Sequence, residues 1–219
     1  MNCILKGIAT SVIVALCACL SAAAQCDFQV ADASGVNLCY QKMQGQQCVR
    51  VTHPQREWPY YAGSKPSGSI VIPSSVTWDG VEYQVVEVGD NAFYGCDSLV
   101  AVDLGRVRRV GSQAFYGCTM LDSVVFPYEL SNVGDGAFAY CRSLRQLSLT
   151  SALTHVGTSA FSLCTGLQKV VLSTQVEDVC DATTFHGVGW MKEAKNQETG
   201  PSGELILTRE CLSVKKISN

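Results

Sequence analysis

Charged residues are scarce in this chain. They make up 16% of its 219 residues, against about a quarter in an average soluble protein. The formal net charge is −3, and basic residues cluster only in short pairs such as Arg108-Arg109 and Lys215-Lys216. Such a surface does not attract the phosphate backbone of a nucleic acid. The composition therefore excludes a disordered, highly charged tail, and we expect no nucleic-acid partner.

Motifs for catalysis and cofactor binding are missing as well. The three histidines, His53, His155 and His186, do not lie in a metal-ligand spacing such as H-E-x-x-H. The stretch Gly200-Pro201-Ser202-Gly203 lacks the G-x-S-x-G order of a nucleophile elbow. The sequence also contains no glycine-rich loop that would cradle a phosphate. We therefore predict a protein that is not an enzyme, with no catalytic residue, no cofactor and no metal.

Apolar runs long enough to span a membrane are absent too. The stretch Ile8–Leu16 is the main apolar run, and it is short and interrupted. It follows a single charge at Lys6 and precedes the small residues Ser21–Ala24. This order is typical of a secretory signal peptide, in which Ala22-x-Ala24 is the cleavage pattern. We predict a signal peptide over residues 1–24 and a mature chain without a membrane span.

A second processing site overlaps the first. The stretch Leu16-Cys17-Ala18-Cys19 resembles a bacterial lipobox, in which Cys19 would be lipidated and become the mature N-terminus, although Cys17 is an unusual residue in that pattern. A retained N-terminal anchor is a third alternative. Both processing routes export the chain and differ in whether it stays tethered. We therefore predict a secreted, cell-surface or cell-envelope protein.

Four tandem blocks share one order of residues. Each block begins with Val-Gly, continues through Ala-Phe and Cys, and ends in a Leu-x-x-Val-x-Leu type of stretch. The blocks start at Val88, Val110, Val133 and Val156, and a degraded fifth copy starts at Val179. The starts lie about 23 residues apart, within the period of roughly 20–29 residues of leucine-rich repeats.

The repeated pattern has a direct physical interpretation. The Leu-x-x-Val-x-Leu stretch predicts a short strand whose first, fourth and sixth side chains point inward. The Val-Gly pair is expected to turn the chain, and Ala-Phe to return to the core from a short helical or turn segment. No coil buries its own apolar face alone, so the copies must stack. The sequence therefore predicts a solenoid of the α/β class, mainly β and loop, of about five stacked coils with one short parallel strand each.

The repeated blocks resemble a known family. Gly89–Leu99, Ser112–Cys118 and the lead-in Ile70–Val76 are similar to the BspA-like leucine-rich-repeat family of Bacteroidales and related bacteria, over roughly residues 25–207. Gly105 replaces the usual Pro at the end of the first strand, and Leu149-Thr150 and Leu172-Ser173 also lack it. The resemblance implies a secreted or surface-associated protein. Some members of the family act as adhesins for host extracellular proteins or other cells.

The ends of the solenoid need covering, because open strand edges invite pairing with other chains. Alternating apolar residues on either side of Gln44-Gly45 predict a hairpin before the repeats. We expect an N-terminal β cap over residues 25–85, repeats over residues 86–178, and a degraded terminal repeat with a C-terminal cap over residues 179–219.

Six of the twelve cysteines fall into two groups, and Cys26 and Cys211 have no obvious partner in the sequence. Cys96, Cys118, Cys141 and Cys164 follow the repeat, and we expect a column of buried, reduced thiols, because parallel side chains in neighbouring coils do not reach disulfide geometry. A metal or redox site in the column is the alternative. Cys39 and Cys48 lie on the two arms of the predicted hairpin, where a cross-strand disulfide is possible in an exported protein.

The sequence indicates one candidate binding surface. Solenoids use their concave faces to bind proteins, and the outward positions of the predicted strands form such a face, although they lack aromatic residues and a merely solvated face is the alternative. The predicted protein-binding residues are Asp103, Ser123, Val125, Gln146, Ser148, Lys169 and Val171. The loop Trp58-Pro59-Tyr60-Tyr61 is richer in residues favoured at interfaces, but we expect it to pack on the cap.

Together these features favour a non-enzymatic module for protein binding or adhesion. The expected partner is a protein, either a host extracellular protein or a surface protein of another bacterium. The alternative is a structural component of the bacterial cell envelope that has no specific soluble ligand.

Overall fold

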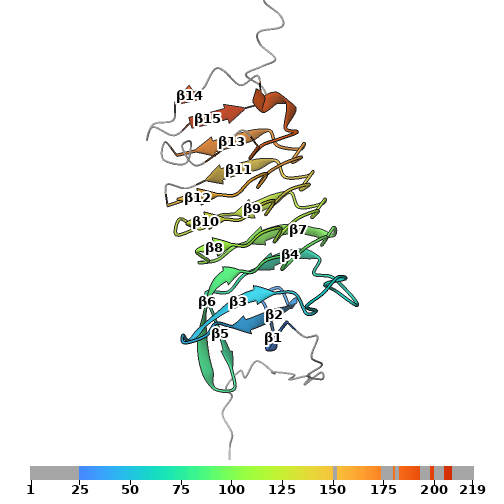
Figure 1. Ribbon diagram of the computed structural model, residues 1–219, viewed down its shortest axis with the longest axis vertical. Helices are drawn as coiled ribbons and strands as arrows, with labels where there is room; N and C mark the ends of the chain where they lie inside the picture. The colour runs from blue at the N-terminus through green and yellow to red at the C-terminus, as the bar shows by residue number, and fades with distance from the viewer. Residues whose placement is uncertain are drawn as a thin grey trace, which may run out of the picture.

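The protein is seen here as a computed structural model that describes residues 25–149, 152–173, 180, 183–192, 198–199 and 205–208. The predicted signal peptide, with Cys19, lies outside the described residues. Within these ranges the chain forms fifteen strands and one short 3-10 helix, η1 (Gly189–Lys192), and no α-helix. The turn alternative therefore holds for the return segments of the coils, and the helical one does not. Figure 1 shows the coils stacked along the long axis of the molecule.

The residues before the repeats form an antiparallel meander. It contains β1 (Phe28–Ala31), β2 (Asn37–Lys42) and β3 (Cys48–Thr52). The predicted hairpin is confirmed as β2–β3, and Gly45 in the connection has a φ of 77°, which glycine adopts without strain. β5 (Ser75–Trp78) pairs antiparallel with β6 (Val81–Val88), and β3 pairs with β6 in parallel.

β6 leads this sheet directly into the repeats. It continues through β8 (Arg109–Val110), β10 (Asn132–Val133) and β12 (His155–Val156), all parallel. Glu87 at the end of β6 is buried between two guanidinium groups, Arg109 at 2.9 Å and Arg50 at 3.4 Å. These ion pairs tie β3 to the first coil, so the N-terminal strands and the solenoid share one continuous sheet (Figure 1).

A second series of longer strands lies on another side of the coils. β4 (Gly68–Val71), β7 (Leu99–Asp103) and β9 (Ser123–Val125) form one sheet. β11 (Gln146–Leu149), β13 (Lys169–Leu172), β15 (Leu205–Thr208) and β14 (Glu198–Thr199) form another. β15 pairs antiparallel with β13, which reverses the direction of the otherwise parallel stack. We call the outward side of β7, β9, β11 and β13 the long-strand face.

The prediction of one strand in each coil is therefore wrong. The coils of β7, β9 and β11 each have a strand from the Leu-x-x-Val-x-Leu stretch and a two-residue strand that ends on the valine of the Val-Gly pair. The valines of these short strands, such as Val110 and Val133, are fully buried. A strand this short carries no alternation pattern that sequence analysis can detect, since the period of two needs several residues to become visible.

The core is built around a ladder of phenylalanines. Phe93, Phe115, Phe138 and Phe161 each lie at most 1% exposed. Their rings stack with centroids 5.0, 5.0 and 5.4 Å apart and planes within 10° of parallel. Ring pairs at such distances add about 0.5–1.5 kcal/mol beyond the burial of their area. The predicted inward placement of the Ala-Phe pair is confirmed.

The glycine of the Val-Gly pair has a different role from the predicted one. None of Gly111, Gly134 and Gly157 has a positive φ, so no left-handed turn requires glycine there. A Cβ built on them would instead lie 2.4–2.6 Å from the nearest atom of the preceding coil, backbone or Asp side chain. These glycines let the backbones of successive coils approach closely.

Candidate binding surfaces

The structure places all the predicted binding residues on the long-strand face. Ser123, Gln146, Ser148 and Lys169 are exposed, Val125 is 58% exposed, and Asp103 and Val171 are half-buried. They alternate with buried residues such as Val102, Leu147 and Val170, as a strand with one face in the core requires. The face therefore presents hydroxyl, amide, ammonium and aliphatic groups side by side.

Asp103 differs from the other six. Its Oδ1 accepts a hydrogen bond from the backbone N–H of Gly105 at 2.8 Å. Gly105 stands where the family usually has a strand-ending proline, and its φ of 60° suits glycine. Asp103 therefore stabilises the turn that ends β7, which leaves it less free to meet a ligand.

A hollow crosses the face where the long-strand sheet is interrupted. β9 and β11 belong to separate sheets, and a hollow of about 490 Å³ lies along β9, β11 and β13. It is lined by Asp122, Ser123, Val124, Arg145, Gln146, Leu147, Ser148, Lys169 and Val171. Asp122 and Arg145 form an exposed ion pair at 3.4 Å at one end of the two strands.

The coil of β9, beside the interruption, carries a phenylalanine at Phe126. Phe126 occupies the position of Leu104, Leu149 and Leu172 in the other coils. Its larger ring packs edge-on against Phe138 and Phe161, with centroids 5.5 and 6.5 Å apart. Val124, two residues earlier, is only half-buried, whereas Val102 at the equivalent position is 1% exposed. The larger ring and the half-buried Val124 thus lie in the coil at which the long-strand sheet is interrupted.

The aromatic loop before the repeats has two parts with different roles. Tyr61 packs on the first coil, and its hydroxyl donates a hydrogen bond to the carbonyl of Ala92. Trp58 is 69% exposed and touches Tyr60 and Tyr94 edge-on, at centroid distances of 5.8 and 5.6 Å. The loop was expected to pack on the N-terminal cap. Tyr60 contacts His53 there at 4.4 Å between ring centroids, whereas Tyr61 packs on the first coil and Trp58 is exposed.

The Trp58 and Tyr60 rings contact the first of several tyrosines that follow one another along the coils. Tyr94 stacks on Tyr116 at 4.9 Å, and Tyr116 contacts Tyr140 at 5.1 Å. We call Trp58, Tyr60, Tyr94, Tyr116 and Tyr140 the aromatic stripe. The sequence pattern concealed it, because Tyr140 stands one position later in its repeat than Tyr94 and Tyr116 in theirs.

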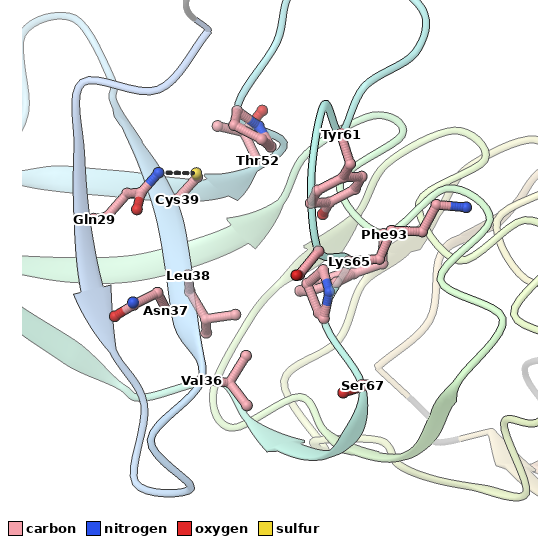
Figure 2. Close-up of a pocket in the computed structure, with 13 residues that line it drawn as sticks. Gln29, Val36, Asn37, Leu38, Cys39, Thr52, Tyr61, Lys65, Ser67 and Phe93 are labelled. Carbon is pink, nitrogen blue, oxygen red and sulfur yellow. Dashed lines mark hydrogen bonds between the residues drawn. The ribbon is translucent and has the colours of Figure 1, made fainter. Parts of the chain in front are cut away.

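A pocket of about 360 Å³ lies between β2, the loop after β3 and the first coil (Figure 2). Its walls combine apolar groups of Leu38, Tyr61 and Phe93 with neutral polar side chains. The hydroxyl of Thr52 is buried there without a hydrogen-bond partner in the described structure. Lys65 at the rim donates from Nζ to the carbonyl of Gly95 at 2.7 Å. The titratable side chains of the lining are Cys39, Tyr61 and Lys65.

The cysteine column is buried and reduced, as expected. Cys96, Cys118, Cys141 and Cys164 are separate thiols with no exposed surface. Cys118, Cys141 and Cys164 each donate a hydrogen bond of 3.1–3.2 Å to the carbonyl of a phenylalanine in the preceding coil. Burial raises the pKa of Cys96 and of Cys164 to about 12. Among the described residues, no group of three or more His, Cys, Asp or Glu side chains is placed to hold a metal ion.

The predicted pairing of Cys39 with Cys48 is wrong. Cys39 on β2 lies opposite Thr52 of β3, and Cys48 lies at the other end of that strand, beside Gln84 of β6. The hairpin register therefore keeps them apart, and a cross-strand disulfide would need directly opposed positions. The length of the turn sets this register, and the apolar alternation alone does not predict that length.

Comparison with known proteins agrees with this fold. The family described as BspA type leucine rich repeat region matches residues 81–194 in six copies. A leucine-rich repeat protein from Bacteroides ovatus superposes with a TM-score of 0.50 at 22% identity, over 66% of this chain and 40% of that one. The chain thus spans less than half the length of that protein, and the likeness shows the fold alone. No curated protein matches.

Two further solved structures share the repeat. A leucine rich repeat protein of T. pallidum is 27% identical over 61% of this chain and 67% of that one, with a TM-score of 0.44. A leucine rich cell surface protein from Faecalibacterium prausnitzii is 22% identical over 65% and 42%, with a TM-score of 0.47. In the part of this chain that the structure describes, no helix has the length and apolar character needed to cross a membrane. Because the family match covers more than half of the 219 residues, the chain belongs to the BspA-type leucine-rich-repeat family.

Proposed function

We propose that this protein is a non-enzymatic, surface-exposed module that binds a polypeptide partner through its long-strand face. Membership in a leucine-rich-repeat family supports the proposal, because solenoid repeats present extended binding surfaces. A structural neighbour is described as a cell surface protein, which supports the same location here. The partner is a host extracellular protein or a surface protein of another bacterium.

The observation that carries the proposal is the hollow beside β9 and β11. Its exposed lining includes Ser123, Gln146 and Lys169, which supply hydrogen-bond donors and acceptors for a backbone or polar side chain. Val125, next to it, is a large aliphatic side chain left 58% exposed on a strand. A polar rim around an apolar contact is the arrangement common to protein interfaces.

The electrostatics of the hollow fit a polypeptide better than a polyanion. Its two cationic side chains are Arg145, which pairs with Asp122 at 3.4 Å, and Lys169. The formal charge of the whole chain is −3. We therefore expect binding that weakens only modestly with salt, because few exposed charges are neutralised at the interface.

The proposal is tested with two matched variants on intact cells and in solution. Val125→Arg places a charge on the long-strand face, and Trp58→Arg places one on the aromatic stripe, at a residue of similar exposure. Purified parent and variant proteins are titrated against immobilised host matrix proteins and surface proteins of co-resident bacteria. We expect Val125→Arg to weaken the parent's binding about tenfold or more, which corresponds to about 1.4 kcal/mol, and Trp58→Arg to leave it unchanged.

Protease added to whole cells gives the second readout. The native protein should be cleaved on intact cells, since an adhesin must face outward. Complete protection, together with no binding to any of the immobilised proteins, would favour the alternative of an envelope component without a soluble ligand. Loss of binding in Trp58→Arg but not in Val125→Arg would move the binding site to the aromatic stripe.

A further inference from the structure

Two thiols meet at the start of the N-terminal meander. Cys26 precedes β1, and Cys39 lies on β2 directly opposite Gln29 of β1. The Cys26 thiol donates to the carbonyl of Phe28 at 2.9 Å. The side-chain amide of Gln29 donates to the Cys39 sulfur at 3.2 Å, the contact drawn as a dashed line in Figure 2. The Cys26 sulfur thus contacts Phe28, and the Cys39 sulfur contacts the next residue, Gln29. The backbone N–H of Asp27 donates to the carbonyl of Tyr40 at 2.8 Å, so the residue after Cys26 is hydrogen-bonded to the residue after Cys39.

We propose that Cys26 and Cys39 are joined by a disulfide bond in the exported protein. Cys118, Cys141 and Cys164 are buried in the core, where each donates to a backbone carbonyl, and Cys48 lies at the far end of the hairpin register. Cys26 and Cys39 are the pair that the chain brings together at a partly accessible corner, since Cys26 is half-buried.

The chemistry of the pair favours oxidation. Hydrogen bonding from Cys39 lowers the pKa of the Cys26 thiol, and the same contact together with burial raises the pKa of Cys39. Cys26 is therefore the thiol that ionises first and attacks a donor disulfide, as supplied by a thiol–disulfide oxidoreductase or by oxidised glutathione. That attack forms a mixed disulfide and releases one donor thiolate. The Cys39 thiol then loses its proton and attacks the Cys26 sulfur, which releases the second donor thiolate and completes the bond.

The bond would act on the exposed edge of the main sheet. β1 is the terminal strand of that sheet and pairs only with β2. Its Phe28 ring stacks on Trp78 at 5.0 Å and on Tyr40 at 5.5 Å. A covalent link from Cys26 to β2 would hold this edge strand in place, so that the aromatic cluster under it stays covered and the edge of β2 stays paired with β1.

Peptide mapping of the purified full chain tests the proposal directly. The protein is equilibrated in a redox buffer of oxidised and reduced glutathione, and free thiols are then blocked with an alkylating reagent. Cleavage before Asp32 and after Lys42 places Cys26, Cys39 and Cys48 on three different peptides. We expect a cross-linked pair of peptides that contains Cys26 and Cys39, lighter by the mass of two hydrogen atoms than the sum of the reduced peptides. Cys48 should be alkylated.

Matched serine variants complete the test. Cys26→Ser and Cys39→Ser should abolish the cross-linked pair, whereas Cys48→Ser should retain it. The parent should also resist protease at its N-terminal strands more than Cys26→Ser does, and a reducing agent should remove the difference. Full alkylation of Cys26 and Cys39 in the folded, equilibrated parent, or a bond from either residue to Cys48, would overturn the proposal. The mapping of the parent decides the matter even if Cys39→Ser does not fold.

Discussion

Replacing Gly134 by Ala tests how closely the coils are packed. Gly134 lies in the third of the four well-formed copies, and its added Cβ would lie 2.6 Å from the backbone nitrogen of Ser112 and 2.7 Å from the carbonyl carbon of Gly111. Both atoms are backbone of the preceding coil and cannot rotate away. The coils would have to separate locally, which would loosen the Phe115–Phe138 stack and the β8–β10 pairing as well.

The expected loss is about 1–3 kcal/mol of the free energy of unfolding, the usual range for forcing extra atoms into a packed interior. For a chain of this size, each kcal/mol lowers the melting midpoint by about 2–4 °C. Thermal unfolding followed by circular dichroism, together with urea titration, measures both quantities. Gly89→Ala is the control, because its Cβ would meet Val51 O at 3.1 Å and the flexible side chain of Arg50 at 3.2 Å.

We therefore expect Gly134→Ala to melt several degrees below Gly89→Ala. Equal midpoints for the two variants and the parent would refute the reasoning, because they would mean that neighbouring coils have room for a methyl group at this position. The glycine of the Val-Gly pair would then have to be explained by local backbone conformation instead.

Three further predictions concern the core, the thiols and the backbone. Phe138→Ala should cost about 3–5 kcal/mol in urea unfolding, because its ring is stacked on both sides; a cost below 1 kcal/mol would argue against the ladder. Burial raises the pKa of Cys164 to about 12. The thiolate forms only as the pH rises toward that value, so it should be almost absent at pH 8. An alkylating reagent should therefore label Cys164 only after denaturation. Labelling of the folded protein at the rate of a free thiol would contradict this. Gln113→Gly should stabilise the fold by up to about 1 kcal/mol, because Gln113 has a φ of 54°, which glycine adopts without strain. Gly136 occupies the same place in the next coil. A loss of stability in this variant would show that the Gln113 side chain makes a contact that outweighs the backbone strain.

Sequence analysis predicted the parts of the fold that repeat. Phe115 and Cys118 recur at fixed spacing, and a residue that must enter the core once per coil produces such a period. The hairpin was also predicted, since Leu38 and Tyr40 alternate with polar residues as a strand with one buried face requires.

Features that depend on contacts between coils could not be predicted from the spacing or the alternation of residues. The need for glycine at position 134 comes from the backbone of residues 111 and 112, which are a full repeat away. The hollow lies beside a coil in which one larger side chain, Phe126, takes a position that is leucine in the other coils. The proximity of Cys26 to Cys39 depends on the register of β1 against β2, which the alternation pattern does not fix.

Photo-cross-linking from the long-strand face tests the central claim most directly. A photoreactive amino acid is introduced at Gln146, which lines the hollow, and in a separate variant at Gln113, which is exposed in a turn away from that face. Cells that carry each variant are mixed with the proteins found to bind the parent and are then irradiated. The proposed function predicts a covalent adduct with the partner from position 146 and none from position 113. Adducts from position 113 alone, or none from position 146 while binding persists, would contradict it.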